Sequence, residues 1–412
     1  MGGEWPQVPL GQVTANLDAK RVPLSKAERS KRPGEIPYYG PTGVFDHVDD
    51  FLFEGLHLLV AEDGSVEQDD GTVFRLLADG RFWVNNHAHI LRGQDEIDTR
   101  WLFYALSATP VRPYISGSVQ DKLTQASLNR LPVFFPDRRA RERGVDLLGA
   151  LDDKIELNRR MAETLEAQAR ALFRSWFVDF DPVRARAEGR SAGLPDPLAA
   201  LFPARFTDDG LPDGWVSATI ADFARLNPES WTAATRPDHI EYVDLANTKW
   251  GRIEVTSSFN ANDAPSRAQR VTRIGDTIVG TVRPGNGAYA LINTEGLTAS
   301  TAFAVLRPRN SRDIAFVYLA LTDARNIESL ASLADGGAYP AVRPGLVAET
   351  SAIRPSEVVL RAFNEVAQPL LSRVQNALTE STTFAALRDT LLPKLISGEL
   401  RIRDAERAVA AA

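Results

Sequence analysis

A long, uninterrupted heptad pattern in the middle of the chain constrains its fold more than any other feature. Apolar residues recur there at alternating spacings of 3 and 4, and neither Gly nor Pro occurs between Ala150 and Phe180. This spacing is typical of an amphipathic helix that packs against another helix. The residues of the pattern are Leu148, Leu151, Ile155, Asn158, Ala162, Leu165, Ala169, Leu172 and Trp176.

The helix is predicted to begin near Arg138 and to end before Pro182. Its roughly forty residues would span about 60 Å, which is more than a compact domain requires. Taken alone, such a helix favours a spacer or a dimerisation rod. A second helical stretch of similar length, about Val358–Ser397, closes the chain.

The two helical stretches are related by an internal duplication. A shift of 219 residues places four apolar residues of the first stretch on four of the second, and it also places Gly117 on Gly336. The preceding regions repeat their markers in order, because DTRWLFYALSA matches DIAFVYLALTD. Retained order indicates a duplicated unit in which a globular domain precedes a long helix. The residues expected to pack in the helix pair are Leu151, Ile155, Leu165, Leu172, Leu370, Val374, Phe384 and Leu391.

The globular regions are predicted to be α+β domains. Short apolar runs bounded by Gly, Pro, Asn and Asp are the signature of strands and turns. Each region also contains a short helical pattern. The predicted segments are a first strand-rich domain at 1–137, a long helix at 138–181, a linker at 182–210, a second strand-rich domain at 211–356, a long helix at 357–400 and a tail at 401–412.

Composition sets broad limits on the class of protein. The chain lacks cysteine, and no apolar run approaches the ~18 residues needed to span a bilayer, so a cytoplasmic protein without a membrane partner is the simplest expectation. The net charge of −7 argues mildly against nucleic-acid binding, but the charge is unevenly distributed. Residues 20–32 carry six bases and one acid, whereas residues 44–70 carry nine acids. These stretches are either a phosphate-binding face beside an acidic one or two solvated loops.

No catalytic motif is found. Asn227-Pro228-Glu229-Ser230 is the sequence nearest to an amino-methyltransferase loop, but it lacks the second Pro and the aromatic residue. A P-loop and a G-x-S-x-G elbow are both absent from the sequence. The glycine-rich stretch Gly280–Gly287 is predicted to be a tight connection between two strands. A Ser-His-Asp set stays open because its members converge only in space.

His87 and His89 are the strongest candidates for metal ligands. They lie two residues apart on an expected strand, so their side chains are predicted to share one face. No third ligand occurs at an evident spacing. A structural or surface role is therefore assigned to both, and no metal site is predicted.

Seven segments together resemble a known family. They occur in order along nearly the full chain, and they are similar to the specificity subunits of type I restriction–modification systems. The segments are IPYYGPTGVFDHVDDFLFEGLHLLVAEDGS, NNHAHIL, SGSVQDKLTQASLNRLPVFFP, LDDKIELNRRMAETLEAQARALFRSWFVDFDP, LPDGW, GDTIVGTVRPGNG and LLPKLISGEL.

This resemblance implies two target-recognition domains, each contacting one half of a split sequence in double-stranded DNA. The two long helices would lie between these domains as an antiparallel coiled coil that sets the spacing, with pseudo-two-fold symmetry. The subunit itself would be non-catalytic and would hold no cofactor. Methyltransferase subunits, and restriction subunits where present, would be the partners that carry S-adenosylmethionine, ATP and Mg²⁺. Apolar Phe173 and Phe177 are expected either to be covered by partners or to be buried by the helix pair.

The resemblance also gives candidate DNA contacts. Lys and Arg supply affinity through phosphates, and polar side chains read base edges. In the second half DGGAYPAVRPG replaces SGSVQDKLTQ and lacks its Lys, so a different half-site is expected. Each candidate could also be an ordinary solvated residue. The candidates are Lys20, Arg21, Lys31, Arg32, Tyr39, Gln120, Lys122, Arg283, Asn286, Tyr339 and Arg343.

Two other functions compete with this interpretation. A stand-alone nucleic-acid-modifying enzyme would methylate or cleave DNA without partners. A coiled-coil scaffold would account for the helices, but it would leave two dissimilar domains without a role.

Overall fold

The computed structural model describes residues 5–117, 120–232 and 234–410, and these residues form two compact units. Unit 1 combines residues up to Leu157 with those from Glu380 onward, and unit 2 comprises Asn158–Thr379. Each unit therefore contains one strand-rich domain and one half of each long helix. This division differs from the predicted segments, in which the helices stood apart from the globular domains.

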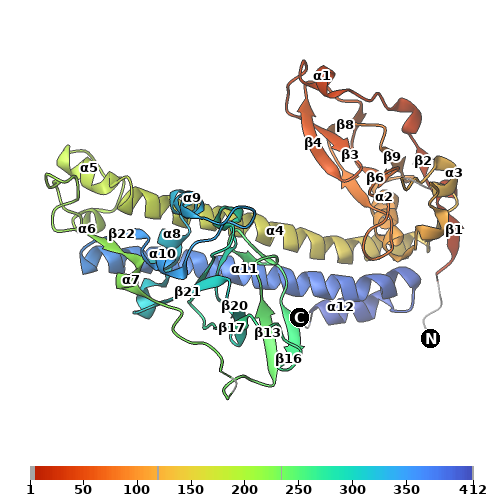
Figure 1. The fold of residues 1–412 in the computed structure, drawn as a ribbon. Helices are drawn as coiled ribbons and strands as arrows, with labels where there is room; N and C mark the ends of the chain where they lie inside the picture. Colours follow the sequence, from red (N-terminus) through yellow and green to blue (C-terminus); the bar gives the residue numbers. More distant parts are fainter. Residues whose placement is uncertain (1–4, 118–119, 233, 411–412) are drawn as a thin grey trace. The chain divides into compact units, whose positions relative to one another are not determined.

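The long helices are α4, Arg138–Phe177, and α11, Glu357–Ser397 (Figure 1). Helix α4 ends four residues before the predicted position 181, and α11 ends three residues before the predicted position 400. After α4, Phe180 adopts a left-handed backbone conformation with φ 55°. After α11, Gly398 takes φ 81°, a conformation that glycine supplies at helix ends without a Cβ penalty.

The two helices run antiparallel within each unit. In unit 1, Arg388 Nη1 lies 2.7 Å from Asp152, and Lys154 lies 3.9 Å from Glu380, so later residues of α4 meet earlier residues of α11. In unit 2, Ala162 packs with Val374 and Ala377. The predicted antiparallel pairing is confirmed. Of the residues expected in the pair, the buried ones are Leu151, Val374 and Leu391, and the half-buried ones are Ile155, Leu165, Leu172, Leu370 and Phe384.

Phe173 and Phe177 lie inside unit 2. They are 7% and 4% exposed and pack around Phe363 of α11 and Phe316 of α8, Ile314–Leu321. The helix α8 places seven consecutive residues in this core. Of the two expectations for these phenylalanines, burial by the chain itself is therefore correct.

Unit 1 contains three small sheets. A two-stranded sheet joins β1 to β10, and two four-stranded sheets have the orders β2-β9-β6-β7 and β4-β3-β8-β5. Within the second of these, β3 and β8 run parallel. The strands are β1 Gln7–Pro9, β2 Ala15–Asn16, β3 Ile36–Gly40, β4 Gly43–Val48, β5 Phe53–Glu54, β6 His57–Ala61, β7 Arg75–Ala78, β8 Arg81–Val84, β9 Ala88–Arg92 and β10 Pro132–Phe134.

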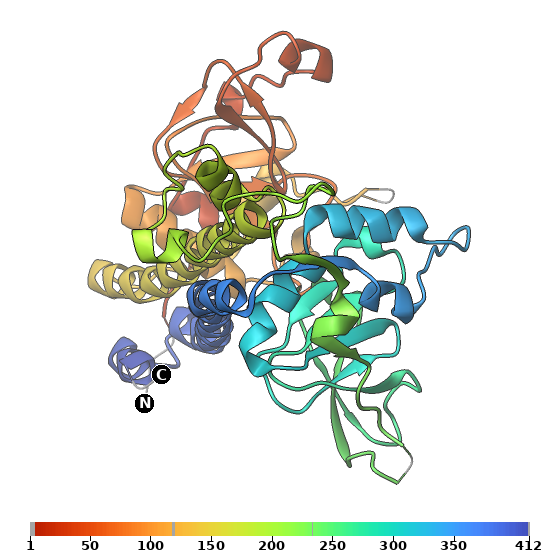
Figure 2. The ribbon, with the colours of Figure 1, turned by 90° about the vertical axis from the view of Figure 1, so that its left-hand side faces the viewer.

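Unit 2 repeats this topology. Its two-stranded sheet is β11-β22, and its four-stranded sheets are β12-β21-β18-β19 and β16-β13-β20-β17, again with one parallel pair, β13 and β20. In Figures 1 and 2 these green to cyan strands lie beside α11. The α+β fold and its duplication are confirmed. The strands are β11 Val216–Thr219, β12 Ala224–Leu226, β13 His239–Val243, β16 Ser257–Asn260, β17 Ala268–Val271, β18 Thr277–Gly280, β19 Tyr289–Leu291, β20 Leu297–Ser300, β21 Phe303–Pro308 and β22 Ser351–Arg354.

The short helices follow the same order in both units. In each unit one helix follows the last strand of the four-stranded sheets, which is β9 in unit 1 and β21 in unit 2. A second short helix precedes the strand that completes the two-stranded sheet, β10 in unit 1 and β22 in unit 2. In unit 1, Trp101 of the first of these helices packs with Leu148 and Leu395, which anchors the domain to its helix halves. The helices are α2 Glu96–Ala105 and α3 Gln125–Leu128 in unit 1, and α8 and α10 Pro344–Ala348 in unit 2.

Among the residues that the structure describes, unit 2 has two insertions that unit 1 lacks. A hairpin of β14, Thr248–Lys249, and β15, Arg252–Ile253, lies between β13 and β16. Helix α9, Ala324–Leu333, follows α8. In unit 1 the equivalent strands β3 and β4 are joined by two residues alone, because the connection runs from Gly40 to Gly43.

The predicted linker and tail are partly helical. Helix α5, Asp181–Ala187, has a proline in its first turn, where the missing N–H carries no penalty, so Pro182 begins a helix rather than excluding one. Phe202 of the linker is buried against Trp176, with 4.8 Å between ring centroids. Two further helices are α6, Asp196–Ala199, and α12, Ile402–Ala410. No helix among the described residues is long and apolar enough to cross a membrane.

Candidate nucleic-acid interface

In unit 2, four of the predicted contacts lie on two loops that pair with each other. The β18–β19 connection and the loop before α10 are joined by a bridge between Val282 and Ala341. The Arg283 N–H donates to Pro340 O at 2.7 Å, and the Val342 N–H donates to Thr281 O at 2.9 Å. These backbone bonds bring together residues that are 57 and 61 positions apart in the sequence.

Arg283 and Tyr339 form the centre of this loop pair. The Arg283 guanidinium lies 4.6 Å from the Tyr339 ring centroid and donates to Ala338 O at 2.8 Å. Arg283 has φ 47°, a left-handed conformation that directs its side chain along the partner loop. Tyr339 is 69% exposed. A guanidinium stacked on an exposed ring retains N–H groups for an anion or a base edge.

Asn286 and Arg343 flank this centre. Asn286 is exposed at the end of the short turn after Arg283, and Arg343 is exposed at the start of α10. Arg343 has no ion pair among the described residues. The structure therefore gathers Arg283, Asn286 and Tyr339 on one surface, with Arg343 four residues beyond Tyr339 in the same loop.

Unit 1 has the same loop pair at the same topological position. The β6–β7 connection pairs with residues 121–123 through a bridge between Asp63 and Lys122, and the Leu123 N–H donates to Glu62 O at 2.8 Å. Gln120 and Lys122 are both exposed. Lys122 Nζ lies 3.5 Å from Glu62, so part of its charge is neutralised within the unit.

The predicted basic stretch of unit 1 is less available than its sequence implied. Arg21 is held by Glu62 at 2.6 Å and by Ala88 O at 2.8 Å, and its side chain is 15% exposed. Arg32 pairs with Asp49 at 2.8 Å and lies 5.0 Å from the Trp83 ring. Arg21 therefore has little side-chain surface left for phosphate, and Arg32 would have to exchange an ion pair for it; both stay predicted contacts.

Three other residues of this region have different environments. Lys20 and Lys31 are exposed and have no ion pair among the described residues, so they remain candidate phosphate contacts. Tyr39 is half-buried, with its ring 5.6 Å from that of Phe82, and burial raises the pKa of its hydroxyl. Tyr39 thus packs in the domain, although part of its surface is open.

His87 and His89 do not share a face, contrary to the prediction. His87 lies in the turn before β9 and pairs with Asp63 at 2.8 Å. His89 is 1% exposed, and its ring nitrogens lie 2.5 Å from Asp18 and 2.7 Å from Leu123 O. Burial raises the pKa of Asp18, but hydrogen bonds from His89 and from the Ile90 N–H outweigh it and lower the pKa.

Asp18, Glu62 and His89 converge closely enough to share a metal ion. However, Arg21 contacts both carboxylates, and Lys122 contacts Glu62. Because cations of the chain already balance these carboxylates, the cluster is a structural network that ties the basic stretch to the paired loops. His87 is not part of this cluster, and the cluster's two carboxylates, Glu62 and Asp18, lie 27 and 71 positions before His89, so the sequence spacing did not reveal them.

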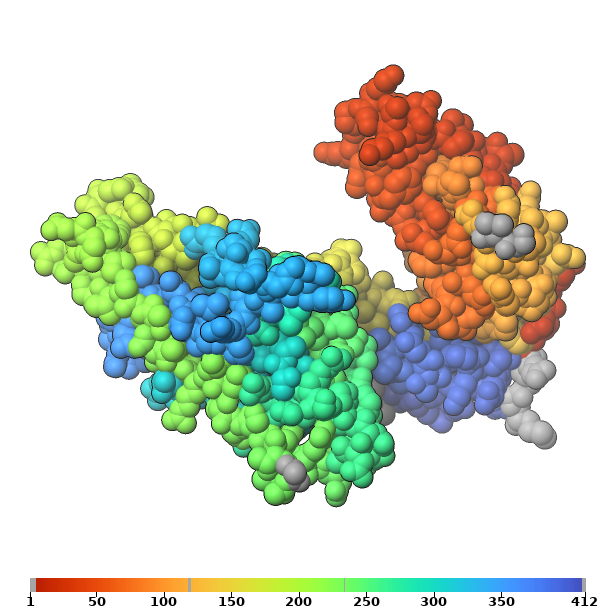
Figure 3. All heavy atoms as spheres, in the orientation of Figure 1, coloured from red at the N-terminus to blue at the C-terminus, as the bar shows by residue number. Residues whose placement is uncertain are grey.

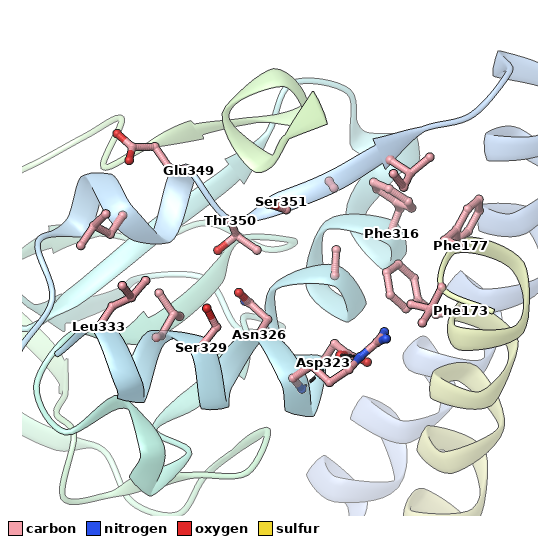
Figure 4. Close-up of a pocket in the computed structure, with 17 residues that line it drawn as sticks. Phe173, Phe177, Phe316, Asp323, Asn326, Ser329, Leu333, Glu349, Thr350 and Ser351 are labelled. Atoms are coloured by element: carbon pink, nitrogen blue, oxygen red, sulfur yellow. Dashed lines mark hydrogen bonds and ion pairs between the residues drawn. The ribbon is translucent and has the colours of Figure 1, made fainter. Parts of the chain in front are cut away.

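A separate hollow in unit 2 lies between α9, β22 and the end of α4 (Figure 4). Its volume is about 520 Å³, and its walls include Phe173, Phe316 and Leu333. The cation in its lining, Arg325, pairs with Asp323 at 3.2 Å, and Glu349 adds a further acid. An apolar hollow with acidic residues does not suit phosphate, so it is not part of the nucleic-acid interface.

The chain is similar to known proteins. Residues 3–167 match the family model described as the type I restriction modification DNA specificity domain. Those residues are similar to that family. The predicted resemblance to the specificity subunits of type I restriction–modification systems is confirmed.

Relatives and a solved structure extend the match beyond the family model. A type I restriction enzyme specificity subunit of Haemophilus influenzae is 33% identical over 150 residues, which are 36% of this chain and 38% of that protein. The HindI specificity subunit of the same organism is 25% identical over 332 residues, or 68% of this chain and 71% of that protein. The crystal structure of the type I S subunit from M. genitalium superimposes with a TM-score of 0.64 at 16% identity and covers 95% of this chain and 96% of that one.

Proposed function

We propose that this chain is a non-catalytic DNA-specificity subunit that binds a bipartite target, with one half-site for each strand-rich domain. One observation carries the proposal: both units present a pair of loops at the same topological position, but the loops have different side chains. Arg283 and Tyr339 in unit 2 correspond in position to residues near Asp63 and Gln120 in unit 1. A repeated scaffold with unlike loops suits the recognition of two unlike half-sites.

The chemistry of the loops supports a DNA ligand. Arg283, Arg343, Lys20 and Lys31 offer cations for phosphates, and Asn286 and Gln120 offer the amide pairs that can bind adenine edges bidentately. The names of the relatives, which are restriction enzyme specificity subunits, support the same conclusion.

The partners and cofactors are part of the same proposal. Methyltransferase subunits, and restriction subunits where the host has them, would carry out the reactions. They would bind S-adenosylmethionine, ATP and Mg²⁺, and this chain would recognise the target sequence on DNA. The antiparallel helices α4 and α11, which contribute to both units, would set the spacing between the half-sites.

The test is a map of methylated adenines on genomic DNA. The chain is co-expressed with its cognate methyltransferase subunit, and the control omits the chain. We expect a split motif that disappears in the control. Methylation that is unchanged without the chain would refute the proposal, and methylation by the purified chain alone would favour a stand-alone enzyme. Partner binding without any DNA motif would favour a scaffold.

A further inference from the structure

His89 of β9 is buried in unit 1 between the Asp18 side chain and the loop that carries Lys122. Its side chain is 1% exposed, and both of its ring nitrogens face oxygen atoms. Nδ1 lies 2.5 Å from an Asp18 carboxylate oxygen, and Nε2 lies 2.7 Å from the Leu123 carbonyl oxygen. A neutral imidazole has one N–H and one acceptor nitrogen, so it can donate to only one of these two oxygens.

Neither of the two oxygens carries a proton of its own. A backbone carbonyl such as that of Leu123 is an acceptor only. Asp18 Oδ1 accepts from the Ile90 N–H at 2.8 Å, and Asp18 Oδ2 also accepts from Asn16 Nδ2 at 3.0 Å. Burial raises the pKa of Asp18, but the hydrogen bonds that it accepts lower the pKa overall, so it is a carboxylate. Both ring nitrogens of His89 therefore have to donate, which only the doubly protonated, cationic imidazole can do.

The charges around His89 agree with a cationic ring. The charged groups of this cluster are Asp18, Glu62, Arg21 and Lys122. Glu62 lies 3.8 Å from His89 Nδ1. Arg21 lies 2.6 Å from Glu62 and 3.7 Å from Asp18. A cationic His89 and Arg21 together balance the two carboxylates, which leaves Lys122 as surplus positive charge.

Lys122 is placed to use this surplus charge. Its side chain is 50% exposed, and its Nζ lies 3.5 Å from Glu62, in an ion pair that solvent weakens. Its backbone is fixed on both sides, because the Lys122 N–H donates to Ser116 O at 2.7 Å and the Leu123 carbonyl faces His89. In Figure 3 the orange-yellow part of unit 1, which contains this loop, forms an exposed surface.

We propose that His89 is held as a cation and is a positioning residue for the DNA-reading loop of unit 1. Its Nε2–H fixes the backbone of the loop. Its charge balances the carboxylates in place of Lys122, so the Lys122 ammonium is available to a phosphate of the unit 1 half-site. Lys122 thereby joins Lys20 and Lys31 as a phosphate contact. This inference rests on the proposed DNA-specificity function and adds a buried residue to it.

The charge of His89 is tested first, by NMR on the full chain labelled with ¹⁵N-histidine. Ring nitrogen shifts distinguish a doubly protonated imidazole from either neutral tautomer. We expect the His89 signal to show two protonated nitrogens near neutral pH and to be absent from His89→Gln. Because the chain has five histidines, single substitutions of the others assign this signal even where His89→Gln does not fold.

The consequence for DNA is tested in the complex with the methyltransferase subunits. His89→Gln removes the positive charge and keeps Lys122 beside Glu62, so the slope of log affinity against log salt should fall by about 0.9, the value for one phosphate. Lys122→Ala should lower the slope by the same amount, and the double variant by no more than either single variant. Fluorescence anisotropy on the mapped target over a salt series measures all three slopes.

His57→Gln is the matched control. His57 is also buried in a strand of unit 1, where its ring packs against Phe53 and Phe82. Its Nδ1 faces Gly55 O, next to its own strand. This variant is expected to lower the unfolding temperature without changing the salt slope.

Three results would overturn the proposal. The first is a His89 ring with a single protonated nitrogen near neutral pH. The second is a salt slope of His89→Gln that equals that of the wild type or of His57→Gln, and the third is an additive loss of slope in the double variant. A wild-type complex without any preference for the mapped target would instead refute the proposed function, and the NMR measurement would still decide the charge of His89.

Discussion

The paired loops of the two units share their backbone pairing and differ in charge. In unit 1, residues 62–74 and 116–123 carry six acids and one base, whereas in unit 2 residues 281–288 and 334–343 carry one acid and two bases. Lys122 is partly neutralised by Glu62, but Arg343 has no ion pair among the described residues. Under the proposed function, the shared topology would set where each unit contacts DNA, and the differing side chains would set which contacts it makes. Unit 2 would then bind phosphates with the arginines of its paired loops, whereas unit 1 would use Lys20 and Lys31, which lie outside its paired loops.

The largest effect is expected from lengthening one helix. Each unit contains one half of α4 and one half of α11. One heptad inserted into α4 between Leu157 and Asn158 therefore displaces one half of α4 by seven residues from its partners in α11. We expect loss of specific DNA binding and of partner assembly, measured by gel shift and size-exclusion chromatography.

A matched double insertion provides the control. A second heptad in α11 between Thr379 and Glu380 restores the pairing in both units. Methylation should then return at a target whose spacer is longer by up to about three base pairs, from about 1.5 Å per residue and 3.4 Å per base pair. Unchanged spacing in the double insertion would exclude the helices as the spacer.

The units also differ in how a half-buried arginine ties the domain to its helices. Arg170 donates to Glu166 at 2.7 Å and to Thr322 O at 2.9 Å, and it lies over the rings of Tyr289 and Tyr318. In unit 1, Arg388 pairs with Asp152 at 2.7 Å, and Asp152 also accepts from the Tyr104 hydroxyl at 2.7 Å. Burial raises the pKa of both Tyr104 and Tyr318, so these hydroxyls stay protonated donors.

Arg170→Ala should therefore cost more stability than Arg388→Ala. Loss of Arg170 leaves Glu166 and a buried carbonyl without their donor, at about 2–3 kcal/mol, whereas Arg388→Ala should cost about 1 kcal/mol. Chemical unfolding monitored by fluorescence measures both. Arg174→Ala, which removes an arginine that is 63% exposed, is the control, with an effect below about 0.5 kcal/mol. Equal losses for Arg170 and Arg388 would contradict this difference between the units.

A smaller effect is expected in DNA affinity from the cations of unit 2. Arg283→Ala combined with Arg343→Ala should weaken binding about tenfold and reduce the slope of log affinity against log salt by about 1.8, if both contact phosphates. Fluorescence anisotropy over a salt series measures both quantities. If affinity falls but the salt slope does not change, these arginines contact bases rather than phosphates.

The smallest effect concerns acid stability. In unit 2, hydrogen bonds from Arg273 and Arg307 outweigh burial and lower the pKa of Glu229 to about 2. Because the folded pKa lies below the unfolded value of 4.5, this stabilisation is complete above pH 4.5 and is lost as pH falls towards 2. The Glu229 side chain is 36% exposed, so solvent screening limits the contribution to about 1 kcal/mol.

Glu229→Gln should thus lower stability at neutral pH and flatten its decline between pH 4.5 and 2. In unit 1, Asp18→Asn should have a similar signature, since the pKa of Asp18 is also lowered. Unfolding curves at several pH values test both. An unaltered pH dependence in Glu229→Gln would show that this ion pair does not stabilise unit 2.

Periodicity and repetition predicted much of the fold, because they depend on local spacing. The heptads predicted α4 and α11, and the repeated order of markers predicted two units of one topology. The insertions in unit 2 were not predictable in this way. The β14–β15 hairpin has no counterpart among the described residues of unit 1, so the repeat did not predict it. The dipeptide Trp250-Gly251 between two polar strands was the available signal of its turn. Pro182 was interpreted as a break, but it starts α5.

The candidate site was predicted less completely than the fold. Gly-rich turns correctly indicated the loops of Arg283 and Tyr339, since glycine permits the close approach that pairs them. The network around Arg21 could not be predicted, because Glu62 and His89 are 41 and 68 residues distant from it. Whether a surface arginine is free depends on such long-range partners, and a single sequence does not show them.

The central claim is that each unit reads its own half-site, and a half-site-resolved map of adenine methylation tests it most directly. Two chains are compared with the wild type: Gln120→Ala with Lys122→Ala in unit 1, and Asn286→Ala with Arg283→Ala in unit 2. Each double variant is predicted to relax one half of the split motif, and the two variants are predicted to relax opposite halves. Relaxation of the same half by both variants, or of both halves equally by either one with folding intact, would contradict the claim.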